Sequence, residues 1–145
     1  MLARLAFVSC LLISAGWAQI QPAQHGIVRR LAEVKFEPDD DVKCLFSTVE
    51  SGDPDKGPST IILKAPAGCL VRWHYHTAEE QLIVVEGSVR TEMAGMPAKQ
   101  LGPGGFAMMP GKVKHQFSCG TPTGCVMFVS FDRAYDIFWV DNKKK

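Results

Sequence analysis

Two histidines and a glutamate at fixed spacing constrain the fold more than any other feature of this chain. Within residues 68–87, His74 and His76 lie two residues apart, and Glu80 follows four residues after the second histidine. Residues two apart on an extended strand point to the same side, so both imidazoles face one way. A short turn through residues 77–78 then brings Glu80 round from the next strand. Two imidazoles and a carboxylate that converge in this way favour a divalent transition metal.

A second segment carries another histidine. From Gly104 to His115 the chain reads Gly-Gly-Phe-Ala-Met-Met-Pro-Gly-Lys-Val-Lys-His. With these two segments the chain resembles the cupin superfamily. The first cupin motif, G-x5-H-x-H-x3-E-x6-G, is matched at every fixed position, by Gly68, His74, His76, Glu80 and Gly87.

The second cupin motif, G-x5-P-x-G-x2-H-x3-N, is matched at three of its five fixed positions, by Gly104, Pro110 and His115. Lys112 stands where the family has its second glycine, and Cys119 stands where it has asparagine. Both departures bear on the shape of the turn, whereas the ligand His115 is retained.

The resemblance covers roughly residues 42–140 and implies a cupin jelly-roll β-barrel, also called a double-stranded β-helix. It also implies one divalent metal, held by His74, His76, Glu80 and His115. Such a site accepts Fe, Mn, Ni, Cu, Co or Zn, because ligand type alone does not select among these ions.

The pattern of short strands independently predicts an all-β fold. From residue 42 onward, apolar segments are separated by glycine and proline, with no convincing amphipathic helix. The expected strands are 42–49, 60–64, 70–76, 81–86, 88–93, 98–101, 106–109, 114–118, 125–131 and 137–140, with a hairpin about Gly87. Strands at this spacing are typical of a sandwich or barrel. A length of 145 residues favours one domain.

The N-terminus has the pattern of a secretory signal peptide over residues 1–18. Arg4 is its only charge, Leu5–Ala15 is apolar or small, and cleavage is expected after Ala18. The apolar run is too short to span a membrane. We therefore expect an exported protein, periplasmic or extracellular, with no membrane span after cleavage. Residues 19–41 form an N-terminal arm, in which 27–34 is either a short helix or an added edge strand, and residues 141–145 form a basic tail.

Charge argues against nucleic acid as a partner. Loss of Arg4 leaves 15 of the 16 basic residues against 15 acidic residues, so the mature chain is formally neutral. No basic stripe or known nucleic-acid motif is present.

Four cysteines remain after cleavage, an even number that permits disulfides in an exported chain. Cys119 and Cys125 flank the turn-forming sequence Gly-Thr-Pro-Thr-Gly, and we expect them to form a disulfide across a hairpin. Cys44 and Cys69 either pair or are small buried residues, and the sequence does not choose between these alternatives.

Alternation along the first metal-binding strand nominates one substrate-binding residue. If His74 and His76 face the interior, then Leu70 and Arg72 face it too. Arg72 would clamp a substrate carboxylate with its planar guanidinium, or pair with an internal acid, or be carried to the rim by the twist of its strand.

Two further residues are nominated in the same way. Phe117 lies on the same side of its strand as His115, and Met108 shares a face with Phe106. We expect Phe117 and Met108 either to form an apolar wall around a small ligand or to be ordinary core residues.

Two strands, 81–85 and 125–131, are apolar on both faces. A strand on one face of a sandwich would alternate, so something must cover the second face. A homodimer is the simplest cover.

The sequence leaves two functions open. No serine or cysteine lies beside a histidine base, so the metal must supply any chemistry, as a redox centre for O2 or as a Lewis acid. The first hypothesis is a metal-dependent enzyme, either dioxygenase-like or a lyase or isomerase, acting on a small organic molecule. The second is a non-catalytic module that binds or senses a small ligand.

Overall fold

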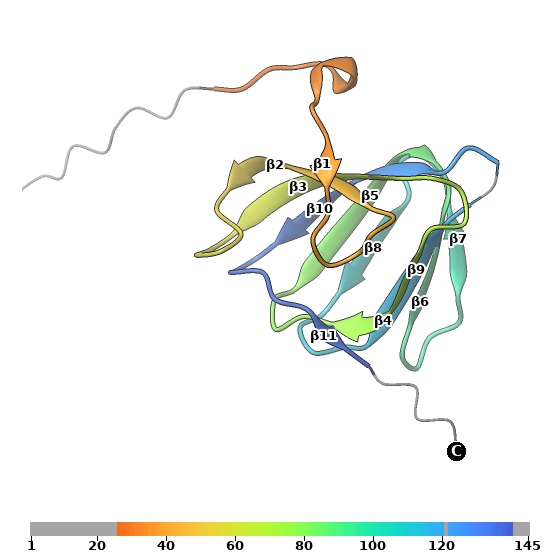
Figure 1. The fold of residues 1–145 in the computed structure, drawn as a ribbon. Helices are drawn as coiled ribbons and strands as arrows, with labels where there is room; N and C mark the ends of the chain where they lie inside the picture. The colour runs from red at the N-terminus through yellow and green to blue at the C-terminus, as the bar shows by residue number, and fades with distance from the viewer. Residues whose placement is uncertain (1–25, 121, 141–145) are drawn as a thin grey trace, which may run out of the picture.

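Two antiparallel β-sheets pack face to face around a single core (Figure 1). The computed structural model describes residues 26–120 and 122–140. The signal peptide and the basic tail expected from the sequence lie outside these residues. In the described part of the chain no helix is long and apolar enough to cross a membrane.

The larger sheet has six strands. In spatial order they are β1 (Glu37–Pro38), β2 (Phe46–Gly52), β3 (Ser59–Ala65), β10 (Cys125–Phe131), β5 (Glu80–Gly87) and β8 (Phe106–Met109). The smaller sheet has five strands: β11 (Phe138–Trp139), β4 (Leu70–Tyr75), β9 (His115–Cys119), β6 (Val89–Met93) and β7 (Lys99–Leu101). A 3-10 turn, η1 (Leu31–Glu33), precedes β1.

The chain repeatedly crosses between the sheets, which is the jelly-roll arrangement that the resemblance implied. Strands β3, β5 and β8 of the larger sheet are followed by β4, β6 and β9 of the smaller one. The expected hairpin about Gly87 is therefore wrong, because β5 pairs with β8 and β10 whereas β6 pairs with β7 and β9. Gly87 instead makes the crossover with φ 71°, and a Cβ there would lie 2.0 Å from the carbonyl oxygen of Gly124.

The strand expected at residues 42–49 begins later than the sequence indicated. Residues 42–45 form a turn in which the Leu45 amide donates to the carbonyl of Val42 at 2.8 Å. The Asp39 carboxylate accepts hydrogen bonds from the amides of Asp41 and Val42, which satisfies the backbone of this turn. β2 then starts at Phe46. The apolar residues Val42 and Leu45 face the interior from a loop and not from a strand.

Two disulfides hold the sandwich together. The expected Cys119–Cys125 bridge is present, but it joins β9 of one sheet to β10 of the other and does not close a hairpin. Cys44 also pairs with Cys69, across a sequence separation of 25 residues, which resolves the alternative left open by the sequence. Both bridges fit an oxidising compartment.

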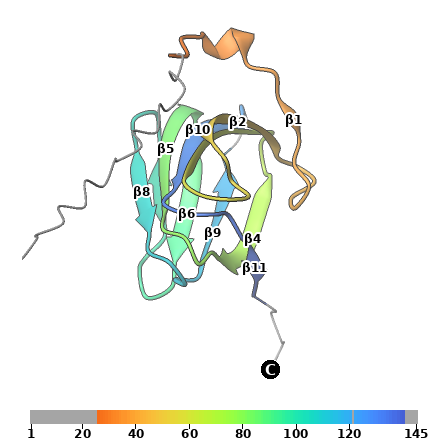
Figure 2. The ribbon, with the colours of Figure 1, turned by 90° about the vertical axis from the view of Figure 1, so that its left-hand side faces the viewer.

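The two faces of the six-stranded sheet differ in how they are covered. The inner face packs into the core through residues such as Leu82, Val84 and Val129, each at most 1% exposed. On the outer face, the N-terminal arm lies over one end of the sheet, where residues 30–36 line a groove with Lys64, Glu86 and Val126 (Figures 1 and 2). Within residues 27–34 the structure has only the short 3-10 turn η1, and the edge strand β1 lies beyond that range at residues 37–38.

Candidate metal centre

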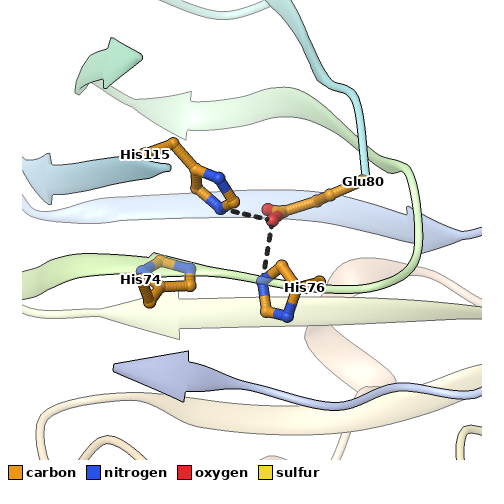
Figure 3. Close-up of side chains that lie close together, drawn as sticks. All are labelled: His74, His76, Glu80 and His115. Carbon is orange, nitrogen blue, oxygen red and sulfur yellow. Dashed lines mark hydrogen bonds and ion pairs between the residues drawn. The ribbon is translucent and has the colours of Figure 1, made fainter. Parts of the chain in front are cut away.

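Four side chains from both sheets converge in the interior (Figure 3). His74 lies on β4, His76 directly follows it, Glu80 opens β5 and His115 opens β9. Their nearest ligand atoms all lie within 4.8 Å of one another, and each residue is 2–3% exposed. The sequence therefore predicted correctly that these residues meet in a buried cluster.

The orientation of each imidazole is set by a backbone carbonyl. Nδ1 of His74 lies 2.7 Å from the carbonyl oxygen of Arg72, and Nδ1 of His115 lies 2.9 Å from that of Val113. Nδ1 of His76 is bonded in the same way to the carbonyl of Asp136. A carbonyl can only accept, so each Nδ1 carries a proton and each Nε2 is the atom left to bind a metal.

Glu80 connects two of the three histidines. Its Oε2 lies 3.0 Å from Nε2 of His115 and 3.1 Å from Nε2 of His76. Burial alone would raise the pKa of this carboxyl, but the hydrogen bonds to the two histidines outweigh burial and lower its pKa to about 2. Glu80 is therefore ionised at neutral pH, as a metal ligand must be.

The histidines differ in how readily they take up a proton. Burial, reinforced by the neighbouring His115, lowers the pKa of His74 to about 4. Burial is the largest single effect on His76 and opposes its protonation, but the hydrogen bond to Glu80, the charge of Glu80 and the contact with Asp136 together outweigh burial and raise its pKa. His74 is therefore neutral at pH 7 and has its Nε2 lone pair free for a metal.

Two aspartates hold the loop between His76 and Glu80. The Asp136 carboxylate accepts hydrogen bonds from both the amide and the hydroxyl of Thr77, at 2.7 and 2.5 Å. Asp132 accepts from the amide of Glu79 at 2.9 Å. Asp136 thus supports His76 through its carbonyl and the adjoining loop through its side chain. No sequence pattern indicated this role, because Asp136 lies 60 residues away from His76.

The second motif keeps its turn despite the lysine. Lys112 has φ 67°, the left-handed conformation that a glycine would adopt most easily. Its amide donates to the carbonyl of His76 at 2.7 Å, which ties the turn before His115 to the end of β4. The neighbouring Gly111 has no room for a side chain, since a Cβ would lie 2.5 Å from the carbonyl oxygen of Thr77.

A cavity of about 80 Å³ adjoins the four ligands. His74, His76 and Glu80 reach its surface, and most of the remaining wall is aliphatic or aromatic, including Phe117. Val42 and Leu45 line it from the turn that precedes β2. Tyr135 lines it from the segment before β11, and its hydroxyl donates to Asp41 at 3.2 Å. The cavity is thus bounded partly by loops that the sequence analysis did not connect with the site.

The inward orientation predicted for Arg72 and Leu70 is wrong. Between Val71 and His74, β4 contains one more residue than its partner β9, and this bulge reverses the alternation. Val71 is 3% exposed and lines the cavity, whereas Leu70 and Arg72 are exposed. The Arg72 guanidinium lies over the ring of Trp139, 4.7 Å from its centre, so its position gives no support to a carboxylate clamp.

The two apolar candidates lie in different places. Phe117 lines the cavity, next to Val71 in the paired strand. Met108 shares a face with Phe106, as expected, but this is the outer face of the sheet, where Met108 is 40% exposed. The pairing of β5 with β8 gives the reason, since Met109 lies opposite the inward Glu80 and Met108 lies opposite Gln81. Met108 therefore does not line the cavity.

The donor set fits one transition-metal ion. Three directed Nε2 atoms and an ionised carboxylate within 4.8 Å supply nitrogen and oxygen ligands that first-row divalent ions accept. The carbonyl partners on Nδ1 are the supporting contacts found at many metal-binding histidines. The four residues that would hold the ion are therefore those predicted from the sequence.

Comparison with known proteins agrees with this geometry. Residues 62–131 match the family model described as a cupin domain. The polyketide cyclase RemF from Streptomyces resistomycificus is similar in structure, with a TM-score of 0.67 and 19% identity over 81% of this chain and 89% of that chain. An RmlC-like cupin from Shewanella frigidimarina gives a TM-score of 0.62 and 21% identity, over 76% of this chain and 93% of that chain.

A third similar structure is the DMSP lyase DddQ from Ruegeria pomeroyi. Its TM-score is 0.59 and its identity 17%, over 79% of this chain but only 59% of that chain. No sequence among curated proteins matches this chain. At these identities, the structural similarities establish the shared fold and do not by themselves carry over an activity.

Proposed function

We propose that this chain, which belongs to the cupin superfamily, is an exported metal-dependent enzyme acting on a small organic molecule. One observation carries the proposal most directly: His74, His76 and Glu80 form part of the wall of a cavity large enough for a ligand. A site that only stored an ion would need no such space beside it. The cyclase and lyase among the similar structures are consistent with catalysis.

Some residues of the site would hold an ion, and others shape the cavity beside it. The three imidazoles present their Nε2 atoms, and Glu80 supplies one negative charge. A bound ion would supply either a redox centre for O2, as in a dioxygenase-like reaction, or a Lewis acid, as in a lyase or isomerase. Phe117 and Val71 form an apolar part of the cavity wall, which keeps water from the reacting molecule.

Elemental analysis of the protein purified from its own host tests this proposal. We expect about one transition-metal ion per chain, and well below one in His76→Ala, with the fold of that variant largely retained. Oxygen uptake or product formation with candidate phenols, thiols and keto acids should follow metal content. Full metal retention in His76→Ala would refute the assignment of the site.

A non-catalytic module that binds or senses a small ligand is the second candidate, and Tyr135 is the observation that favours it. Tyr135 is the cavity-lining phenol, and burial together with the nearby Asp41 raises its pKa far above the ordinary value. The phenol therefore stays protonated at neutral pH and can orient a ligand by a hydrogen bond. Tightly bound zinc with no turnover of any candidate substrate would support this second function.

Export and dimerisation complete the proposal. The N-terminal pattern and the two disulfides support export.

On the outer face of the six-stranded sheet, Phe106, Ile83 and Phe128 lie opposite one another on β8, β5 and β10 and are 55%, 47% and 37% exposed. We propose that a second copy of the chain covers this row, because the described part of the arm lies at the other end of the sheet.

A further inference from the structure

The cavity beside the four ligands is small. Its volume is about 80 Å³. One water molecule needs about 10–15 Å³ of such space, so the cavity has room for a ligand of roughly five to eight non-hydrogen atoms. A sugar phosphate or an extended chain would not fit without opening the loops that bound it.

The lining of the cavity contains carboxylates but no lysine or arginine among the described residues. The carboxylates are those of Asp39 and Glu80. Arg72, the cation expected from the sequence, is exposed and lies over Trp139. An anionic group that entered would therefore meet no lysine or arginine side chain.

The formal charges also balance without a ligand. Glu80 and Asp39 together carry two negative charges, which offset one divalent ion. An added carboxylate or phosphate would leave a net negative charge in a largely apolar enclosure, and an uncompensated charge there is costly. An uncharged molecule adds no such cost.

The wall offers only a few polar atoms to such a molecule. Asp39 already accepts two backbone amides through Oδ1, and the Tyr135 hydroxyl donates to Asp41, which leaves the phenol oxygen as an acceptor. Apart from the metal-ligand candidates His74, His76 and Glu80, the other lining residues are apolar. A ligand with an apolar body and one polar group matches this distribution.

We infer that this cavity takes a small, uncharged, mainly apolar molecule with a single polar group and discriminates against anions of the same shape. The inference rests on the proposed function, since it names the substrate or ligand class of that site. It assigns Asp39 as the residue that sets the charge preference, a role that depends on its carboxylate and not on the turn that it also supports.

Isobutyramide and isobutyrate test the inference, because they have the same shape and differ in charge. Binding of each to the full-length mature protein, with its metal content measured in the same sample, should be followed by calorimetry or ligand-detected NMR. We expect the amide to bind at least tenfold more tightly than the carboxylate. A bulky amide, 4-tert-butylbenzamide, should not bind.

Two kinds of variant locate the binding. Asp39→Asn keeps the Oδ1 acceptor of the turn and removes the charge, so it should narrow the preference for the amide severalfold while leaving the fold intact. Ile61→Trp should fill the cavity from β3 and abolish amide binding without loss of metal. Leu63→Trp serves the same purpose if the first substitution prevents folding.

The outcomes separate this inference from the proposed function. Isobutyrate binding as tightly as isobutyramide, or neither molecule binding to protein with one metal per chain, would overturn the inference. Protein that holds no metal but still prefers the amide would refute the proposed function alone, because Asp39 and Glu80 face the cavity in either case.

Discussion

The two faces of β5 show how one strand separates two roles. Glu80, Leu82 and Val84 point inward and are at most 2% exposed, and they join the metal ligands and the core. Gln81 and Ile83 point outward, and Ile83 is 47% exposed in an apolar row across neighbouring strands. Neighbouring residues in one strand therefore contribute either to an ion site or to a surface, according to parity alone.

On the inner face polar contacts specify the positions of the ligands, whereas the outer row is defined only by its apolar area. Each inner ligand has a named partner, such as the carbonyl of Asp136 for His76. The outer row has no such partners, so substitutions there should affect association and leave the ion site unchanged. The predictions below test that separation.

The largest loss of metal affinity is expected when the charge is removed at the inward position 80. A charge added at the neighbouring outward position 81 is the matched control. Glu80→Gln removes the ligand charge and should weaken metal binding by more than about 100-fold, beyond what loss of a supporting residue costs. Gln81→Glu adds the same group one residue along on the exposed face and should leave the affinity unchanged. Competition with a chelator of known affinity measures both variants. Similar losses in both would show that the faces are not independent.

A smaller loss is expected from the residue that supports His76. Asp136→Ala removes the two hydrogen bonds to Thr77 and should weaken metal binding about 10- to 100-fold. Asp136→Asn keeps one acceptor and should recover part of the affinity. Glu33→Gln, which alters a hydrogen-bonded carboxylate in the arm, is the matched control. The d–d spectrum of the cobalt-loaded protein should change in Asp136→Ala alone, because only that variant displaces a ligand.

Stability of the metal-free protein should depend on pH through His74. Its pKa falls from the ordinary 6.5 to about 4 in the folded state, so the unfolded chain takes up a proton more readily. The resulting stability is complete above pH 6.5 and is lost as pH falls toward 4. Since a tenfold change in an equilibrium constant is about 1.4 kcal/mol, the loss is at most about 3.5 kcal/mol.

Two neighbouring groups modify that profile. Glu80, with its pKa lowered from 4.5 to about 2, adds a further loss below pH 4.5. His76, whose pKa is raised, works in the opposite direction and loses its contribution as pH rises through that higher pKa. Urea unfolding of the metal-free protein between pH 4 and 7 measures the sum. His74→Gln should flatten the decline between pH 6.5 and 4, and an unchanged slope would contradict the assignment to His74.

The smallest effect on the ion site is expected from the outer face. Ile83→Lys places a charge in the apolar row and should convert the proposed dimer to a monomer in analytical ultracentrifugation. Metal content should not change, because the side chain points away from Glu80 and its neighbours. An unaltered mass would argue against this face as the dimer interface, and a loss of metal would contradict the separation of the two faces.

Local motifs and long-range contacts differed in how far the sequence could predict them. The spacing from His74 to Glu80 identified three ligands, because it spans one strand end, one short turn and one strand start. The Thr77–Asp136 contact could not be predicted, since it depends on where the chain before β11 returns. Arg72 was misplaced because the bulge in β4 is visible only once the pairing with β9 is known.

Residue type and short spacing were enough to predict an all-β chain of short strands and the Cys119–Cys125 bridge, and the resemblance to the cupin motifs added the four candidate ligands. The pairing of Cys44 with Cys69, the crossover at Gly87 and the lack of a lysine or arginine among the described residues that line the cavity emerged only from the folded chain. These features depend on which strands become neighbours and in what register. The physical reason is that a single extra residue in a strand reverses every side chain beyond it, and only the partner strand shows where that residue lies.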